Sequence, residues 1–179
     1  MTKQHTGHRT LLLFRHAKSA WGDLDLDDHE RPLSQRGAKA APKMGAYLAQ
    51  QNLKPTLILC SDSVRTRATC ALVAPELGTP PPQVETLGRL YLAPPITLLE
   101  TIRNIDDKHT SAMIIAHNPG LHGLALTLTG KGDRNAIKDM SIKFPTAAVA
   151  VLSFDTKSWQ QIAPAMGCLE DFQVPRSLK

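Results

Sequence analysis

The sequence predicts a three-layer α/β/α sandwich whose central, mostly parallel mixed sheet has about six strands. Short apolar runs of strand length alternate along the chain with longer amphipathic stretches of helix length. Several of these runs are continuously apolar, which is typical of strands that helices cover on both faces. Because the chain has 179 residues, we expect one domain over residues 10–179 behind a loose polar tail at residues 1–9.

The first half of the chain predicts three strands and two helices. Ser34 opens a helix that runs to about Asn52 with one apolar face, and a second helix follows the second strand. The predicted strands lie at residues 11–15, 56–60 and 84–87. A long polar loop at residues 17–35 is expected to be solvated, because its acidic cluster lacks the spacing of a calcium loop. These acidic residues are Asp23, Asp25, Asp27, Asp28 and Glu30.

The second half predicts a helix over residues 95–105, a buried strand at residues 111–116, and a helix that ends at Leu128. No element is predicted in the mixed polar stretch 130–145. The remaining elements are an antiparallel pair of strands at residues 147–154 and 159–163, joined by a turn.

Composition narrows the classes of partner. The net charge is +5 with a pI of about 9.3, which favours an anionic substrate or an acidic partner. The basic residues are scattered and aromatic residues make up only 4%, so base stacking has little support and we expect no nucleic-acid partner.

Cysteine content and hydropathy bear on the compartment. Cys60, Cys70 and Cys168 are an odd number without metal-ligand spacing, and we interpret them as buried apolar residues in a reducing compartment. No apolar run has the length of a membrane span, and the first apolar run is too short for a signal peptide. We therefore expect a cytoplasmic protein without a membrane partner. The oligomeric state is not indicated.

Candidate functional residues stand at the ends of three predicted strands. Arg15 and His16 follow the first strand, Arg65 follows the second at the start of a helix, and His117 follows a later one. Ligands in parallel sheets bind at the carboxyl ends of strands, so these side chains are expected to share one crevice. Two guanidinium groups, two imidazoles and a helix N-terminus together favour a phosphate.

These residue types have the chemistry of phosphoryl transfer. Arg15, Arg65 and His117 can stabilise the charge on the phosphoryl oxygens. His16 can attack phosphorus and carry it as a phosphohistidine, which divides one difficult step into two. Because cationic side chains supply the charge, we expect neither a metal nor a cofactor.

The same residues resemble the histidine phosphatase (phosphoglycerate mutase-like) superfamily. The resemblance rests on Arg15-His16, on the pattern Ser61-x-x-x-Arg65-x-x-x-Thr69, and on the strand-terminal His117. Several further motifs look most like the small SixA-type phosphohistidine phosphatases. They are the Arg-His-Ala-Lys-Ser run at residues 15–19, Arg31-Pro32-Leu33-Ser34, Arg36-Gly37 and Ala116-His117-Asn118-Pro119-Gly120-Leu121. Ala17 departs from the family, which commonly has Gly there.

The resemblance covers about residues 11–163 and implies a phosphoglycerate mutase-like fold without a large capping insertion. It also implies a covalent phosphohistidine on His16 and phosphate contacts from the other three strand-terminal residues. Arg31 is a weaker candidate for the same phosphate. Further substrate-binding candidates are Lys18 and Ser19, which follow the nucleophile, and Asn118, which follows His117.

A general acid is missing from the expected place. Larger members of the resembled family carry a Glu on an insertion after the third strand, whereas residues 88–95 here contain no carboxylate. An alkoxide, whose conjugate acid has a pKa near that of water, about 16, needs a proton donor to leave. An imidazole, with a pKa of about 6.5, can already be protonated. Weaker candidates for an acid are Glu85, Glu100, Asp62 and Asp23.

The sequence therefore predicts a phosphatase that acts through phospho-His16, with phosphohistidine on a protein as its substrate. Without a capping insertion, the pocket is expected to be shallow and open to a side chain on a protein surface. Two alternatives stay open. One is a phosphatase for a small phosphomonoester or anhydride, and the other is a non-catalytic phosphate- or phosphopeptide-binding module.

Overall fold

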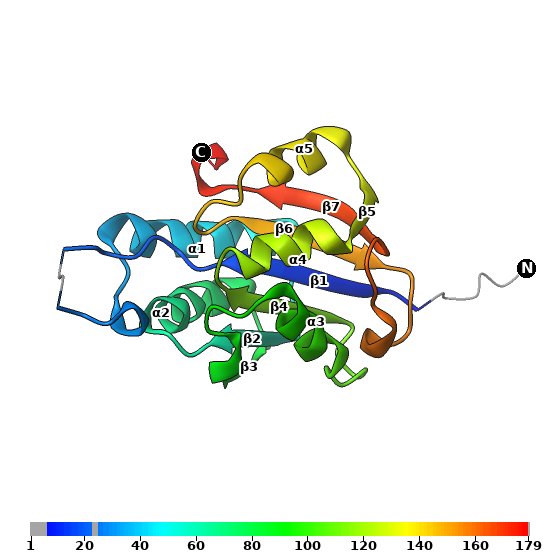
Figure 1. Ribbon diagram of the computed structural model, residues 1–179, viewed down its shortest axis with the longest axis horizontal. Helices are drawn as coiled ribbons and strands as arrows, with labels where there is room; N and C mark the ends of the chain where they lie inside the picture. Colours follow the sequence, from blue (N-terminus) through cyan, green and yellow to red (C-terminus); the bar gives the residue numbers. More distant parts are fainter. Residues whose placement is uncertain (1–6, 23–24, 179) are drawn as a thin grey trace, which may run out of the picture.

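The computed structural model of the chain describes residues 7–22 and 25–178, and its centre is one seven-stranded sheet (Figure 1). The strand order is β3-β2-β4-β1-β6-β7-β5. The strands are β1 (Arg9–Arg15), β2 (Leu57–Ser61), β3 (Gln83–Leu87), β4 (Ser111–Ala116), β5 (Thr129–Gly132), β6 (Val149–Phe154) and β7 (Gly167–Gln173).

Five α-helices pack on this sheet within the described residues. They are α1 (Gln35–Gln50), α2 (Val64–Val73), α3 (Pro95–Arg103), α4 (Gly120–Leu128) and α5 (Arg134–Ile142). Short 3₁₀ turns lie between the elements: η1 (Asp28–Glu30), η2 (Ala74–Leu77), η3 (Gly88–Leu90), η4 (Trp159–Gln161) and η5 (Pro175–Ser177). None of the helices in the described ranges has the length and apolar character needed to cross a membrane.

The three-layer arrangement follows from the alternation of side chains along the strands. In β1, Leu12 and Phe14 pack with buried residues of α1 and α2 on one face. Leu11 and Leu13 point to the other face and pack with α3, α4 and α5. Because helices cover both faces of β1, its successive side chains are all apolar, and the strand is a continuous apolar run in the sequence. The predicted α/β/α sandwich is confirmed.

Parallel pairing brings the ends of three strands together. β4 lies between β2 and β1 and is parallel to both. Arg15 at the end of β1 is in register with Ala116 at the end of β4, and Cys60 near the end of β2 is in register with Ile115. The residues that follow these strands therefore emerge at one edge of the sheet.

The second half of the chain differs from the sequence prediction. Residues 159–163 do not form a strand, because Trp159 lies in the turn η4, where its indole N–H donates to the His109 carbonyl at 2.6 Å. The antiparallel partner of β6 is β7. β7 lies between β6 and the short β5, and its adjacent Glu170 and Asp171 interrupt the alternation where the register with β6 shifts. It therefore shows neither a continuous apolar run nor strict alternation.

Residues 130–145 are also more ordered than predicted. β5 contains two glycines in four residues and no large apolar side chain, so no strand pattern is visible. In α5, which Asp133 caps by accepting from two backbone N–H groups at 2.9 Å, Met140 is the one buried residue. The sheet consequently has seven strands instead of about six.

Smaller differences concern the N-terminus and the cysteines. β1 begins at Arg9, within the stretch predicted as a tail, and residues 1–6 lie outside the described residues. Cys60 and Cys70 are buried as predicted, but Cys168 on β7 is only half-buried. All three are free thiols.

The loop after β1 is anchored to the start of α1. Ser34 caps α1 by accepting from the Gly37 N–H at 3.1 Å. Its own N–H and hydroxyl donate to the Lys18 carbonyl at 2.8 and 3.1 Å. A Cβ on Gly37 would lie 2.2 Å from the same carbonyl oxygen. Gly37 is therefore required for this close approach.

Gly37→Ala is expected to lower the free energy of unfolding by about 1–3 kcal/mol, because the new methyl group meets backbone that cannot move freely. Helix propensity alone predicts the opposite, an increase of about 1 kcal/mol in the free energy of unfolding. Urea unfolding measures the difference. Gly22→Ala is the control, since a Cβ there has no atom within 4 Å. A stabilised Gly37→Ala variant would contradict the described contact.

Candidate active site

A cavity of about 410 Å³ lies at the edge where β1, β2 and β4 end. Arg15, His16, Arg65 and His117 all line it, so the convergence expected from the sequence is present. The other residues around it are Lys18, Ser19, Trp21, Asp28, Arg31, Leu92, Asn118 and Thr146. Every substrate-binding candidate from the sequence is in this set.

The His16 ring is held in one tautomer. Its Nδ1 lies 2.7 Å from the Ala17 carbonyl oxygen. A carbonyl only accepts, so Nδ1 carries the proton and Nε2 of the neutral ring keeps its lone pair. Burial, with the nearby charges of Arg65 and Arg15, lowers the pKa of His16 to about 4. The ring is neutral at pH 7 and can act as a nucleophile through Nε2.

His117 lies beside the nucleophile, with a distance of 5.2 Å between the two ring centroids. Its Nε2 is 2.8 Å from the Ser61 hydroxyl, and its Nδ1 is 3.4 Å from Nη2 of Arg65. Burial and then His16 and Arg65 lower its pKa to about 3. Because the Arg65 guanidinium can only donate, Nδ1 accepts and the Nε2–H of the neutral ring donates to the Ser61 hydroxyl in this structure. The Ser61 hydroxyl can also donate to Nε2, so the other tautomer, with the proton on Nδ1, is open to the ring when an anion takes over Arg65.

The spacing Ser61, Arg65 and Thr69 has a structural reason. Ser61 ends β2 and orients His117. Arg65 is the second residue of α2, and Thr69 lies one helical turn further on the same face. The Thr69 hydroxyl accepts from the Ala17 N–H at 3.0 Å and donates to the Arg65 carbonyl at 2.7 Å. The motif therefore joins the nucleophile's loop to the helix that carries Arg65.

Arg15 and Arg65 place two positive charges in the cavity. Arg15 donates to the Phe144 carbonyl at 2.9 Å, and its Nε has no hydrogen-bond partner in the described residues. Burial and then the charge of Arg65 lower the pKa of Arg15. A buried and a half-buried guanidinium group that repel each other favour an anion between them.

Asp28 is a carboxylate in the same cavity, and the sequence interpretation of its loop as solvated is wrong for it. One carboxylate oxygen accepts from Nη2 of Arg65 at 2.8 Å and from the Tyr91 hydroxyl at 2.5 Å, while the other pairs with Arg31. Although burial favours the neutral form, these partners lower the pKa of Asp28 to about 2. Asp28 therefore occupies donors that a phosphate could use.

The acid candidates from the sequence lie elsewhere. Glu85 on β3 accepts from the Gln83 amide, and Glu100 is exposed on α3. Asp62 pairs with His29 at 3.0 Å, and Asp23 lies outside the described residues. Among the described residues, Asp28 is the one carboxylate that lines the cavity. Asp28 stands three residues before Arg31, with which it pairs, and this spacing was the signal in the sequence that could have identified it.

The remaining residues form the floor and the rim. Ser19 is buried and pairs with Leu33 through an isolated bridge. The amide of Asn118 donates to the Phe144 carbonyl at 2.9 Å. Trp21 is 68% exposed and lies 3.6 Å from the Arg31 guanidinium carbon, which stacks on its ring. Tyr91, whose ring meets His117 edge-on at 5.3 Å, was not identified from the sequence.

Comparisons with known proteins agree with this geometry. A model of the histidine phosphatase superfamily (branch 1) matches residues 11–90. An uncharacterized protein of Mycobacterium leprae is 37% identical over 166 residues, which cover 90% of this chain and 99% of the relative. An uncharacterized chloroplastic protein of Arabidopsis thaliana is 33% identical over 161 residues, covering 86% and 70%.

Solved structures with the same fold include SixA proteins. A structure from Nakamurella multipartitia described as "Putative Phosphohistidine Phosphatase SixA" has a TM-score of 0.82 and 25% identity, with coverage of 94% of this chain and 97% of that one. A protein histidine phosphatase SixA complexed with tungstate has the same fold, with a TM-score of 0.75 and 21% identity. The match covers 95% of this chain and 99% of that one. The chain belongs to the histidine phosphatase superfamily and has the phosphoglycerate mutase-like fold of SixA structures.

Asp28→Asn is expected to bind inorganic phosphate roughly two- to fivefold more tightly than the wild type. The substitution removes a partly exposed negative charge that competes for Arg65 and Arg31, and such a pair contributes about 0.2–1 kcal/mol. Isothermal titration calorimetry with orthophosphate measures the affinity. Asp106→Asn, which removes an exposed carboxylate paired with Lys108, is the control. Weaker binding by Asp28→Asn would mean that the carboxyl group helps to hold phosphate.

Proposed function

We propose that this chain is a phosphohistidine phosphatase that acts on proteins through a covalent phosphohistidine at His16. The observation that carries the proposal is the hydrogen bond from His16 Nδ1 to the Ala17 carbonyl. It directs a nitrogen lone pair into a cavity surrounded by guanidinium groups. No hydrogen bond within the described residues occupies Nε2.

In the first step the Nε2 lone pair attacks phosphorus and the bond to the leaving group breaks. The His16 ring keeps its proton on Nδ1 and becomes positively charged, which the Ala17 carbonyl stabilises. Arg15, Arg65 and His117 stabilise the charge on the phosphoryl oxygens. In the second step water attacks phosphorus, the Nε2–P bond breaks, and dihydrogen phosphate leaves with both protons of the water.

The leaving group argues for a P–N substrate. When the second ring nitrogen of a phosphohistidine is protonated, its imidazole departs neutral, so no acid is needed in the active site. An alkoxide would need a proton donor at that moment. The carboxylate that lines the cavity, Asp28, has its pKa lowered to about 2 in the free protein and is therefore ionised.

The entrance of the cavity supports a protein substrate. Only seven residues, 88–94, connect β3 to α3, and they form the turn η3 and the segment that carries Tyr91 and Leu92. This is the place where the resemblance implies an insertion in larger members of the superfamily. A short connection covers little of the site, so a side chain on a protein surface has room to enter.

A small phosphomonoester is the second candidate, and Asp28 is the observation that favours it. If phosphate takes over Arg65, Asp28 loses one of the three partners that stabilise its charge, and its pKa rises although Tyr91 and Arg31 remain. It could then protonate an alkoxide. Comparing turnover of a phosphohistidine-bearing protein with turnover of a panel of sugar phosphates separates the two functions. A preference for the sugar phosphates would favour this second function.

His16→Ala is expected to abolish turnover of phosphohistidine and the acid-labile phosphoenzyme, because it removes the Nε2 lone pair that attacks phosphorus. Rapid acid quench with ³²P-labelled substrate measures both. His122→Asn is the matched control, because His122 lies outside the cavity and bonds the Met140 carbonyl. Retained turnover in a clean His16→Ala preparation would overturn the mechanism. Binding without turnover by the wild type on every phosphorylated substrate would favour the non-catalytic module.

A further inference from the structure

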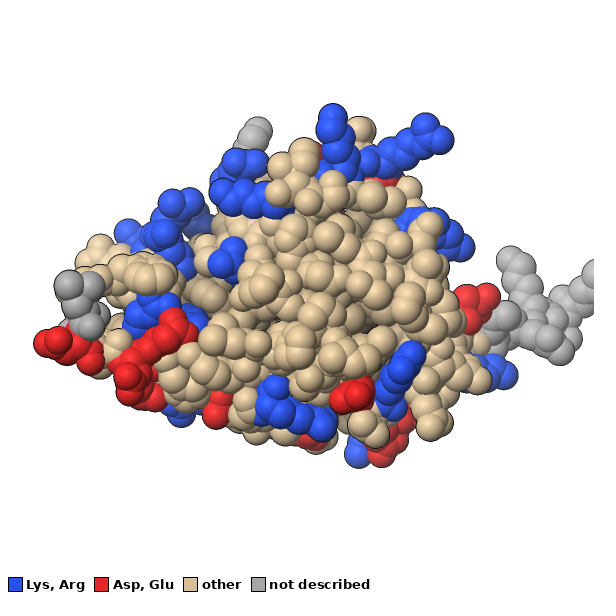
Figure 2. All heavy atoms as spheres, viewed as in Figure 1, with Lys and Arg blue, Asp and Glu red and all other residues tan. Residues whose placement is uncertain are grey.

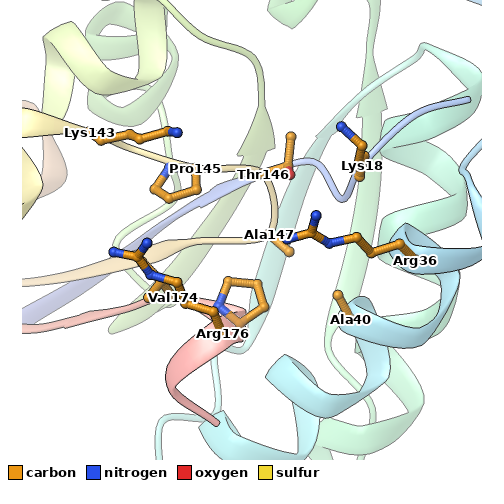
Figure 3. A pocket seen from close by; sticks show the side chains of 10 residues that line it. Lys18, Arg36, Ala40, Lys143, Pro145, Thr146, Ala147, Val174 and Arg176 are labelled. Atoms are coloured by element: carbon orange, nitrogen blue, oxygen red, sulfur yellow. The ribbon is translucent and has the colours of Figure 1, made fainter. Parts of the chain in front are cut away.

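A second hollow, distinct from the phosphate cavity, lies between α1 and the C-terminal segment. It has a volume of about 130 Å³ and is surrounded by Lys18, Arg36, Lys143 and Arg176. Figure 3 shows Lys18 and Arg36 on one side of the hollow and Lys143 and Arg176 on the other. Pro145, Thr146 and Ala147 form the floor between them.

The hollow continues along α1 as a groove. An adjoining depression of about 460 Å³ shares Arg36 and Arg176 and adds Lys39 and Lys43. Residues 36, 39 and 43 follow one face of a helix, opposite the buried Met44 and Leu48. At 1.5 Å per residue, Arg36 and Lys43 are about 10 Å apart along the axis, which is longer than one phosphate. We call the two hollows together the basic groove.

The charge of the basic groove is uncompensated in the described part of the chain. No Asp or Glu lines either hollow. Its six cationic side chains make no ion pair in the described residues. All of them are exposed. In Figure 2, basic side chains gather at the upper left, over α1 and the C-terminal end, whereas the acidic side chains at that end of the molecule lie lower.

The basic groove adjoins the phosphate cavity. Lys18 and Thr146 line both spaces. Lys18 is two residues from His16, and its carbonyl is bonded to Ser34 at the start of α1. A chain whose phosphorylated side chain enters the cavity can therefore continue across Lys18 into the groove.

We propose that the basic groove binds acidic residues that flank the phosphohistidine of a protein substrate, an inference that rests on the proposed function. Its length and its spread of charges fit several carboxylates along an extended segment, at about 3.3 Å per residue, better than one compact anion. No aromatic residue lines it, so it lacks the stacking platform that nucleic acids use. Lys18 is the junction between the phosphate and these carboxylates.

The test compares three phosphohistidine substrates: a synthetic peptide with Asp and Glu on both sides, the same peptide with Ser at those positions, and free phosphohistidine. The wild type is expected to hydrolyse the acidic peptide with a kcat/KM roughly tenfold above that of the Ser peptide. Three exposed charge pairs at about 0.5 kcal/mol each give this factor. The preference falls as salt is raised from 50 to 300 mM, because the charges are exposed.

The triple variant Arg36→Gln/Lys143→Gln/Arg176→Gln is expected to lose the preference and to keep wild-type turnover of free phosphohistidine. The control Lys131→Gln/Arg134→Gln/Lys138→Gln removes the same charge from β5 and α5, outside the groove. It is expected to keep the preference.

Equal kcat/KM on both peptides in the wild type, or equal losses in both triple variants, would overturn the groove assignment. If the groove variant loses kcat/KM only on a small bisphosphate substrate, the groove binds a second phosphate instead of carboxylates. This result would also overturn the groove assignment. If no substrate is hydrolysed, the proposed function fails. The groove is then judged by fluorescence anisotropy with the unphosphorylated acidic peptide, which the wild type should bind more tightly than the groove variant does.

Discussion

The hydrogen bond between His16 Nδ1 and the Ala17 carbonyl is the interaction on which the chemistry of this site depends. It fixes the tautomer, so the lone pair of Nε2 faces the cavity. This hydrogen bond requires a fixed position of Ala17, and the Thr69 hydroxyl holds Ala17 by accepting from its N–H. Thr69 also donates to the Arg65 carbonyl, so the same side chain holds the loop that carries His16 and the helix turn that carries Arg65. Parallel pairing of β1, β4 and β2 brings these parts to the same edge.

Electrostatic balance explains the rest of the site. The guanidinium groups of Arg15 and Arg65 make the cavity positive beside two neutral imidazoles, and in this structure Asp28 provides a counter-charge. A phosphoryl group has to compete with that carboxylate for Arg65. On the other side of Lys18 the basic groove has no such counter-charge in the described residues. The cavity therefore has one carboxylate of its own to offset part of its positive charge, whereas neither hollow of the groove is lined by a carboxylate.

The sequence predicted the features that continuous apolar runs and strand-terminal residues reveal. The buried strands β1, β2 and β4, and the convergence of Arg15, His16, Arg65 and His117, belong to this class. β5 and β7 were missed because glycines and exposed polar residues hide their pattern. Asp28 reaches the cavity from the turn η1, and Tyr91, which follows the turn η3, contacts Asp28 and His117. Both were missed because no periodicity places side chains of such turns.

The position of phosphate on the His16 ring tests the central claim most directly. The phosphoenzyme can be trapped with a phosphohistidine substrate, digested at alkaline pH and examined by mass spectrometry and ³¹P NMR, which distinguish the two ring isomers. The hydrogen bond at Nδ1 predicts a single product, phosphorylated on Nε2 of His16. Phosphate on Nδ1, or on a residue other than His16, would contradict the account.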